Sequence, residues 1–215
     1  ARLQPARETS GDFYDFIPLS NGNRGIVIAD VTDKGMGAAM FMALSSTLIR
    51  TYALQYPTLP AFAMGIVNDR ILSDTRGSMF VTAFFGVLEP HTGRLRYVNA
   101  GHPPPLMVSS TKGKPVDQLR VTGMALGMVE RTTWQQKVVK FSPGDVLLLY
   151  TDGITEAENL DGDIFGEDRL FDVLLPRRSC SAEELQNSVF EEINGFTGSQ
   201  ATIDDIAVMV VCRKK

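Results

Sequence analysis

Short apolar runs separated by polar, glycine-containing segments cover much of the chain, and they predict β-strands. The runs are rich in valine, isoleucine, leucine and aromatic residues, which favour extended structure. We expect strands at 25–30, 105–110, 118–123, 133–142, 144–153 and 204–215. Segment 78–101 predicts a hairpin, because two apolar arms flank the turn sequence EPHTG.

Longer apolar segments predict helices. Residues 37–55 combine small and apolar side chains, and 59–74 form a second helical segment that starts at a proline. Two amphipathic stretches follow near 165–175 and 181–196. The strands cluster in antiparallel order and the two long helices are consecutive. This pattern favours an α+β fold, with sheets covered by helices, over alternating βαβ units.

The composition is that of an ordinary globular protein and fits one domain, or two small ones. The chain has 215 residues, of which 44% are hydrophobic and 21% are charged. Its formal charge is −4, from 21 basic and 25 acidic residues, and no basic stripe indicates a nucleic-acid partner. The apolar runs are too short to cross a membrane, so we expect no membrane contact by this domain.

The sequence does not resemble an exported or disulfide-bonded protein. Residues 1–15 are polar and mixed, unlike a signal peptide. Cys180 and Cys212 form neither a metal-like cluster nor a disulfide framework, and Cys180 lacks the surrounding loop of a cysteine phosphatase. We therefore expect a cytoplasmic protein. Because the sequence starts without methionine, we expect it to be the C-terminal part of a longer, regulated protein.

Aspartates stand at the ends of the most apolar runs. They occur in SGDFYDF (Asp12, Asp15), IADVTDKG (Asp30, Asp33), LLLYTDG (Asp152) and TIDDIAVMVV (Asp204, Asp205). A carboxylate at a buried strand end is unfavourable unless a cation or hydrogen-bond donors compensate for the lost water. If these acids converge, their repulsion requires a cation. Oxygen ligands without a His or Cys cluster favour Mg²⁺ or Mn²⁺.

Each of these acids, taken alone, also has a structural explanation. A single aspartate at a strand end is commonly a cap or a turn former. Asp33 is better explained as the N-cap of the 37–55 helix than as a metal ligand, and Asp145 as a turn residue before its strand. Gly35 and Gly37 are expected to let the chain turn tightly before that helix.

Six segments, in this order along the chain, resemble the metal-dependent protein phosphatase (PPM) family, and most closely its bacterial sporulation and stress-response branch. They are SGDFYDF, IADVTDKGMGAAMFMA, YVNAGHPPPLMV, LLLYTDGITEAEN, FGEDRL and DDIAVMVV, and the resemblance extends from about residue 3 to 212. It implies an α-β-β-α sandwich of two antiparallel sheets flanked by helices. It also implies that residues 1–215 form a single phosphatase domain.

The resemblance further implies a centre of two Mn²⁺ or Mg²⁺ ions. By its place in the motifs, Asp30 would bridge both ions, and Val31 would add its backbone carbonyl. Asp152 and Asp204 would hold one ion, and Asp12 would support the other. Two such ions lower the pKa of a shared water, which would attack phosphorus in line without a phosphoenzyme.

Other positions in or near these motifs take different roles. Asp15 is a poorer match to the first acidic motif, and Asp205 stands where many relatives carry asparagine, so we expect it outside direct metal contact. Arg7 is the candidate for holding the substrate phosphate, as an arginine in a similar place does in eukaryotic relatives. His102 could be a general acid, although bracing the loop after the hairpin is the favoured role. Lys34 could neutralise the acids or meet the substrate, but a solvated surface lysine is the more frequent outcome.

The function implied by the resemblance is a serine/threonine phosphoprotein phosphatase that acts in partner switching. Its substrate would be a phosphorylated STAS-domain anti-sigma antagonist, and its partners an N-terminal sensor or receiver domain and a second copy in a homodimer. The alternative is a catalytically weak or inactive member of the fold that serves as a regulatory binding module. A two-metal phosphodiesterase is disfavoured, because such enzymes usually carry several histidine ligands and this chain has two histidines.

Overall fold

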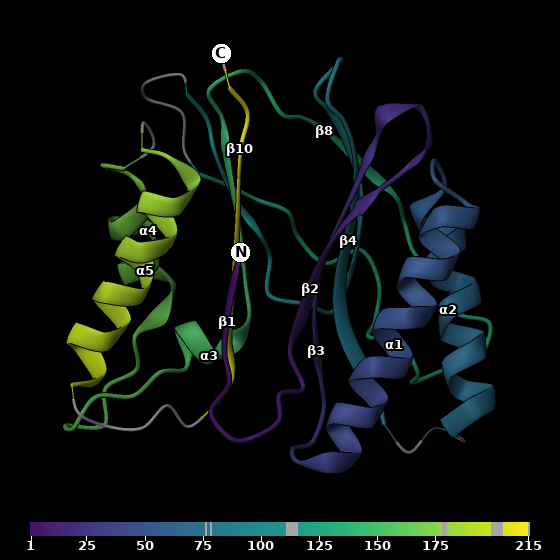
Figure 1. Ribbon diagram of the computed structural model, residues 1–215, viewed down its shortest axis with the longest axis horizontal. Helices are drawn as coiled ribbons and strands as arrows, with labels where there is room; N and C mark the ends of the chain where they lie inside the picture. The colour runs from purple at the N-terminus through teal and green to yellow at the C-terminus, as the bar shows by residue number, and fades with distance from the viewer. Residues whose placement is uncertain (76, 78, 111–115, 178–179, 199–203, 215) are drawn as a thin grey trace. The chain divides into compact units, whose positions relative to one another are not determined.

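The computed structural model of the protein describes residues 1–75, 77, 79–110, 116–177, 180–198 and 204–214. The chain divides into two compact units. Unit 1 comprises Ala1–Glu8, Pro103–Leu119 and Ser142–Lys215, and unit 2 comprises Thr9–His102 and Arg120–Phe141. Each unit holds a five-stranded antiparallel sheet and its own helices (Figure 1). The predicted α+β class, with two antiparallel sheets flanked by helices, is therefore confirmed.

The sheet of unit 2 has the strand order β2-β3-β4-β5-β8. The strands are β2 (Phe13–Pro18), β3 (Arg24–Val31), β4 (Val81–Glu89), β5 (Arg94–Ala100) and β8 (Lys137–Lys140), with the 3-10 helix η1 (Ser20–Gly22) after β2. Strands β4 and β5 form the predicted hairpin around the EPHTG turn. The β3–β4 register pairs Asp30 with Thr82, so these two side chains lie on the same face of the sheet.

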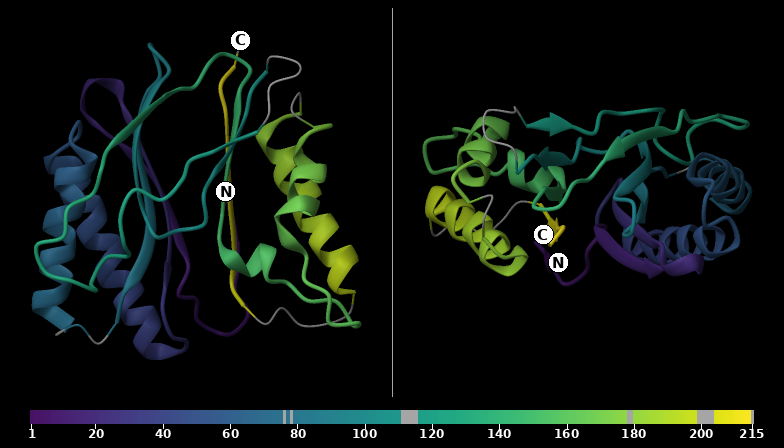
Figure 2. Two further views of the ribbon diagram at one scale, coloured as in Figure 1. Left: turned by 180° about the vertical axis from the view of Figure 1, so that it is seen from behind. Right: turned by 90° about the horizontal axis from the view of Figure 1, so that it is seen from above.

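Helices α1 (Met36–Gln55) and α2 (Pro60–Thr75) cover one face of this sheet (Figure 2). Their buried side chains form one apolar core with alternate residues of the strands. That core includes Val27, Ala29, Phe85, Val98, Phe41, Ile49 and Val67. Because strand side chains alternate between faces, Asp30 and Thr82 lie on the face opposite the helices.

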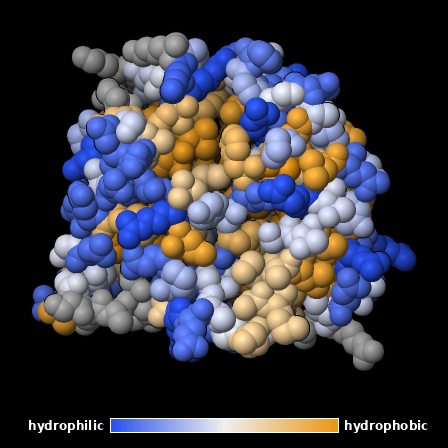
Figure 3. Space-filling model, in the orientation of Figure 1, coloured by the Kyte–Doolittle hydropathy of each residue, from blue (hydrophilic) through white to orange (hydrophobic). Residues whose placement is uncertain are grey.

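The methionines of α1 divide between core and surface. Met42 packs against the core, as predicted for most of this helix. Met36 and Met40 are 68% and 69% exposed, and the space-filling view shows hydrophobic surface over the first turns of the helix (Figure 3).

The turn that leads into α1 differs from the expectation for Asp33. The helix begins at Met36 and its N-cap is Gly35, so the prediction that Asp33 caps the helix is wrong. Asp33 has a φ of 80° and its Oδ1 accepts a hydrogen bond from the backbone of Lys34 at 2.9 Å. Gly35 has a φ of 88°, whereas Gly37 lies inside the helix. The tight turn therefore uses left-handed conformations at positions 33 and 35.

The sheet of unit 1 has the strand order β1-β10-β9-β6-β7. Its elements are β1 (Arg2–Gln4), β6 (Leu106–Val108), β7 (Asp117–Gln118), β9 (Val146–Tyr150), α3 (Asp152–Thr155), α4 (Gly166–Leu174), α5 (Ala182–Thr197) and β10 (Ile206–Cys212). Leu148 and Val208 from the sheet pack with Leu170 and Ile193 from the helices. Helix α5 begins with a capping box in which Ser181 and Glu184 bond each other's backbones.

Two predicted strands are shorter than expected. Within segment 118–123, Gln118 pairs in β7 and Gly123 forms only an isolated bridge with Ala100, while the backbone of Thr122 donates to the carbonyl of Asn99. Segment 133–142 pairs only at β8, because the indole of Trp134 is anchored to the carbonyl of Met124 at 2.8 Å. Strands β1 and β2 and the short helix α3 were not predicted. Among the helices of the described chain, none combines the length and apolar character needed to cross a bilayer.

Candidate active site

The first acid pair, Asp12 and Asp30, lies at one end of the sheet of unit 2. Phe13 of β2 is paired with Ala29 of β3. Continuing this antiparallel register by one residue places Asp12 opposite Asp30. Asp12 is 2% exposed, and its backbone nitrogen donates to Ser10 Oγ at 3.0 Å. Strand pairing therefore fixes the two backbones that carry this pair.

A glycine keeps the space beside this pair open. A Cβ at Gly11 would lie 3.1 Å from the carbonyl oxygen of Val31 and 3.8 Å from Oδ1 of Asp30. Both atoms are oxygen ligands in the predicted metal centre, and a side chain at position 11 would fill the space over them. This cradle and its oxygen donors fit a hard divalent cation.

The second acid pair, Asp152 and Asp204, lies in unit 1 where β9 ends and β10 begins. Thr151 donates its backbone N–H to the carbonyl of Ala207 at 3.1 Å and accepts at Oγ1 from the Ala207 N–H at 2.9 Å. The hydroxyl of the buried Tyr150 lies 3.3 Å from Oε1 of Glu167. These bonds hold the end of β9, and Asp152 begins α3 directly after it.

A glycine also determines how closely the second pair can approach. A Cβ at Gly153 would collide with the backbone carbonyl of Asp205 and would lie 3.5 Å from the Cβ of Asp204. The close packing of α3 on the segment before β10 is therefore possible only with glycine at position 153. In the sequence Asp152-Gly153, the aspartate is thus the candidate ligand and the glycine is required by the close packing.

The electrostatics of the second pair disfavour two ionised carboxylates. Burial raises the pKa of Asp152, and the negative charges of Glu156 and Asp204 raise it further. Hydrogen bonds from the backbone oppose this shift only in part. A cation beside Asp152 and Asp204 would remove the repulsion, because it favours the charged form of both groups.

The structure thus gathers the predicted carboxylates two at a time, one pair in each unit. Across the described residues, no group of three or more His, Cys, Asp or Glu side chains is close enough together to hold a metal ion.

Other predicted acids have structural partners. Asp15 forms a two-point ion pair with Arg50 of α1, at 2.6 Å and 2.8 Å. Asp145 accepts from the backbones of Ser142 and Ser110, which makes it the predicted turn residue. Asp205 Oδ1 accepts from the backbone of Ala6 at 2.8 Å.

The two cationic candidates lie in exposed positions. Arg7 is exposed in unit 1, three residues after the end of β1. Lys34 is exposed between Asp33 and Gly35, in the turn before α1. Neither position by itself identifies a contact with substrate, so the role of Arg7 stays a prediction.

His102 is buried at the end of the hairpin and is only 1% exposed. Its backbone nitrogen donates to Asn99 Oδ1 at 2.8 Å, as expected for a residue that braces this loop. Its Nδ1 lies 2.9 Å from the hydroxyl of Thr82. No sequence pattern identifies Thr82, because a threonine in a strand is ordinary. The glycines at 11 and 153 could have been found from their places beside motif acids.

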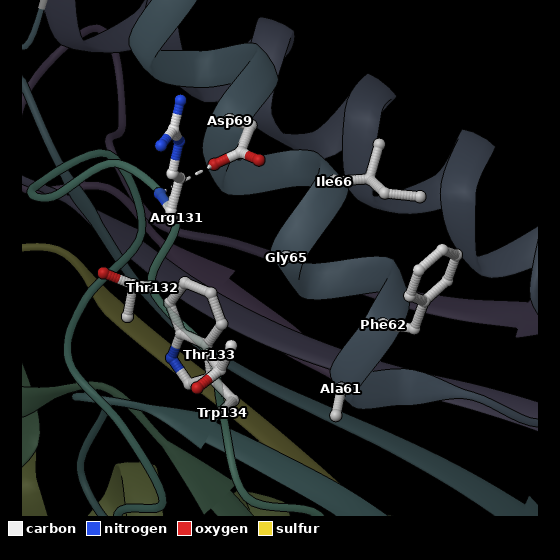
Figure 4. A pocket seen from close by; sticks show the side chains of 9 residues that line it. All are labelled: Ala61, Phe62, Gly65, Ile66, Asp69, Arg131, Thr132, Thr133 and Trp134. Atoms are coloured by element: carbon white, nitrogen blue, oxygen red, sulfur yellow. Dashed lines mark hydrogen bonds between the residues drawn. The ribbon is translucent and has the colours of Figure 1, made fainter.

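A separate groove of about 450 Å³ lies in unit 2, between α2 and the segment that ends at Trp134 (Figure 4). Phe62 of α2 and Trp134 contribute aromatic walls. Asp69 accepts at Oδ1 from the backbone of Arg131 at 3.3 Å, which ties the two sides together. The lining contains neither acid pair, so the groove is not part of the candidate active site.

Residues 20–214 match the family model of stage II sporulation protein E (SpoIIE). The chain is 34% identical to protein IcfG of Synechocystis over 99% of its own length. It is 27% identical to the phosphoserine phosphatase RsbU of Bacillus subtilis over 98% of its length. The chain spans 37% of IcfG and 61% of RsbU, so it corresponds to a part of each relative.

A solved structure has the same fold. The SiaA-PP2C domain of Pseudomonas aeruginosa matches with a TM-score of 0.86 and 19% identity, over 98% of this chain and 84% of that one. This likeness agrees with the predicted fold class of two antiparallel sheets with flanking helices.

Proposed function

The chain belongs to the SpoIIE family, and on this premise we propose that it is a metal-dependent phosphatase of phosphoserine or phosphothreonine in proteins. The observation that carries the proposal is the first acid pair. There, the Asp30 carboxylate and the Val31 carbonyl adjoin a space that Gly11 leaves open. Among the relatives, RsbU is a phosphoserine phosphatase, and the structural neighbour RsbX was solved in complex with magnesium.

We assign five oxygen donors to two Mn²⁺ or Mg²⁺ ions. They are the carboxylates of Asp12, Asp30, Asp152 and Asp204 and the backbone carbonyl of Val31. Asp30 would take the bridging role that the family motifs imply. Ions bound there would supply Lewis-acid activation of a water and neutralise charge on the phosphoryl oxygens.

The protein's own contribution is to hold these donors in place and to make a cation necessary. Pairing of β2, β3 and β4 fixes the backbones of Asp30 and Val31 before any ligand arrives. The second acid pair contributes unfavourable charge, since the pKa of Asp152 is already raised by burial and by Asp204. Preorganised donors need little rearrangement during the reaction, which is why such sites are effective.

The substrate that we propose is a phosphorylated STAS-domain anti-sigma antagonist. The family and the named activity of RsbU support a phosphoprotein substrate. A phosphate group alone offers few contacts, so recognition would come from a wider protein surface, with Arg7 as the candidate for the phosphate itself. The expected N-terminal sensor or receiver domain and the homodimer stay predictions, as does the single-domain organisation of residues 1–215.

The test follows both metal binding and turnover. Excess Mn²⁺ should raise the melting temperature relative to EDTA, because a ligand that binds only the native state stabilises it by about 2.7 kcal/mol at 100 times its Kd. For a chain of this size that is roughly 5–10 °C. A phosphorylated STAS-domain protein should then lose phosphate with Mn²⁺ and keep it with EDTA.

Small esters provide the comparison. We expect p-nitrophenyl phosphate to have a much lower kcat/KM than the phosphoprotein, because remote contacts orient the reacting ester. Equal melting temperatures with Mn²⁺ and EDTA would contradict the metal centre. Metal binding without turnover of any phosphoprotein would favour the alternative, a regulatory binding module.

A further inference from the structure

We propose that Thr82 and His102 are positioning residues that hold the metal-binding end of β3. The proposal rests on the assignment of Asp30 and Val31 as metal ligands. Neither Thr82 nor His102 is assigned a metal contact. Their task is to fix the backbone from which two ligand oxygens project.

Thr82 is the direct neighbour of Asp30 across the sheet. The two residues are paired in the β3–β4 register, and their side chains share the face opposite the helices. The Thr82 hydroxyl donates to the backbone carbonyl of Asp30 at 3.4 Å, which is a long hydrogen bond. Hydrogen bonds in catalytic sites are often long before ligands bind and shorten in the loaded state.

His102 determines where the Thr82 hydroxyl points. Nδ1 of His102 lies 2.9 Å from Thr82 Oγ1. A hydroxyl has one hydrogen to give. When Thr82 donates it to the Asp30 carbonyl, His102 must supply the hydrogen of the second bond from Nδ1. The direction of the chain is therefore from His102 through Thr82 to the backbone of Asp30.

His102 is itself held in a fixed position. Its backbone donates to Oδ1 of the fully buried Asn99, whose own backbone nitrogen donates to the hydroxyl of Thr122 at 3.0 Å. Gly101 precedes it with a φ of 73°, and a Cβ there would lie 3.2 Å from the backbone nitrogen of Ala125. The imidazole thus projects from a backbone that is held by hydrogen bonds, and its Nδ1 contacts Thr82 of β4.

The polar character of this corner contrasts with its surroundings. One step further along the same face, the paired residues are Ile28 and Phe84, and both are fully buried. Buried polar side chains are unfavourable unless their hydrogen bonds are made. A chain of Asn99, His102 and Thr82 beside the proposed bridging ligand is explained if the bonds orient that ligand. Partners behind metal ligands commonly have this role.

The experiment compares matched substitutions at both positions. Thr82→Val removes the hydroxyl at nearly constant shape, and Thr82→Ser keeps it. His102→Asn places an amide where Nδ1 stood, whereas His102→Gln places it nearer Nε2. We measure the affinity of the folded proteins for Mn²⁺ by calorimetry, and turnover over a range of Mn²⁺ concentrations.

We expect Thr82→Val and His102→Gln to bind Mn²⁺ about 10–100-fold more weakly, as is typical when a partner behind a metal ligand is lost. Thr82→Ser and His102→Asn should stay close to the wild-type protein. Excess Mn²⁺ should restore most of the turnover of Thr82→Val, because its metal ligands remain, and should not restore Asp30→Ala.

Two results would overturn the proposal. In the first, folded Thr82→Val binds Mn²⁺ as tightly as the wild-type protein. In the second, both histidine variants lose the same stability and the same affinity, which would mean that His102 only braces its loop. If the wild-type protein itself binds no Mn²⁺, the proposed function fails instead, and the two failures are thereby distinguished.

Discussion

The two acid pairs are built on different principles. In unit 2, Asp12 and Asp30 belong to adjacent segments of one sheet, and Gly11 leaves the space beside their oxygens open. In unit 1, Asp152 starts a short helix against the segment that carries Asp204, and Gly153 permits a close approach of the two backbones. Glycine permits a close approach of backbones in both pairs, and the approach at Gly153 is the tighter one.

The surroundings of Asp152 are unfavourable for its charge. Partial burial raises the pKa of Asp152, and the charges of Glu156 and Asp204 raise it further. Directly after β3, Thr32 instead donates two hydrogen bonds to the carbonyl of Phe80, one from its backbone N–H and one from its hydroxyl. The surroundings of the two pairs therefore differ: at Asp152 they disfavour the charged carboxylate, and at the end of β3 they hold the backbone by hydrogen bonds.

The largest effect should come from removing a ligand of either pair. We expect Asp30→Ala, Asp152→Asn and Asp204→Asn to lose metal-dependent phosphoprotein turnover by more than the roughly 10²–10⁴-fold typical of a lone acid–base group. The control is Asp15→Asn, whose carboxylate bonds Arg50 and should matter little for turnover. Steady-state rates with Mn²⁺ measure this, and full activity in Asp30→Ala would refute the ligand assignment.

The two glycines should respond differently to the same substitution. Gly153→Ala drives a methyl group into the carbonyl of Asp205 and should lower the melting temperature strongly. Gly11→Ala requires the carbonyl of Val31 to shift by only a few tenths of an ångström, so we expect a smaller loss of stability than for Gly153→Ala. Its Mn²⁺ affinity should fall by about 10-fold, the lower limit for disturbing the surroundings of a metal site.

Gly65→Ala is the matched control for both variants, because a Cβ there meets nothing within 4 Å. It lies inside α2 and should stabilise the helix by up to about 1 kcal/mol. Thermal unfolding and calorimetry separate the effects. If Gly11→Ala and Gly65→Ala bind Mn²⁺ equally well, the open space beside Asp30 has no role in binding.

The smallest expected effect is the change in melting temperature caused by Asp152→Asn, and its sign should differ with and without metal. The folded protein holds the pKa of Asp152 above its usual value. The folded state therefore loses stability relative to the unfolded state as the pH rises above that usual value. In metal-free protein near neutral pH, Asp152→Asn should therefore raise the melting temperature. With excess Mn²⁺ it should lower it relative to wild type, because a ligand is lost.

Asp172→Asn, at an exposed position on α4, is the control for this charge change. The difference in melting temperature between Asp172→Asn and the wild-type protein should keep the same sign when Mn²⁺ is added. Scans in EDTA from acidic to neutral pH measure the sign directly. A metal-free Asp152→Asn protein that is less stable than wild type at neutral pH would show that the buried charge is already compensated.

Much of the fold follows from local sequence, because its longest elements have strong patterns. The β4–β5 hairpin has two apolar arms around a turn, and α1 and α2 are long apolar segments. Strand β2 does not follow from local sequence, because FYDFIP mixes aromatic and acidic residues. The acid within it, Asp15, bonds Arg50, which is 35 residues away and therefore not a local signal. Helix α3 has four residues, too few for a periodic pattern.

The sequence indicates a chemistry for the candidate site and does not indicate its arrangement. Acids at the ends of apolar strands indicate unfavourable charge wherever they are buried. The ordered motifs of the family contain the same acids. The sequence does not say which acids share a unit, because that depends on strand register. Nor does it identify Thr82, which lies opposite Asp30 in the paired strands although the two residues are 52 positions apart in the sequence.

The pairing of β1 with β10 joins Arg2 to Val208, near the two ends of the sequence. During synthesis, the sheet of unit 1 cannot be completed until β10 has left the ribosome. Unit 2 needs nothing beyond Phe141. The segments that carry Asp12 and Asp30 can thus pair while those that carry Asp152 and Asp204 are still being made. Such distant pairings are the ones that close late when a chain folds.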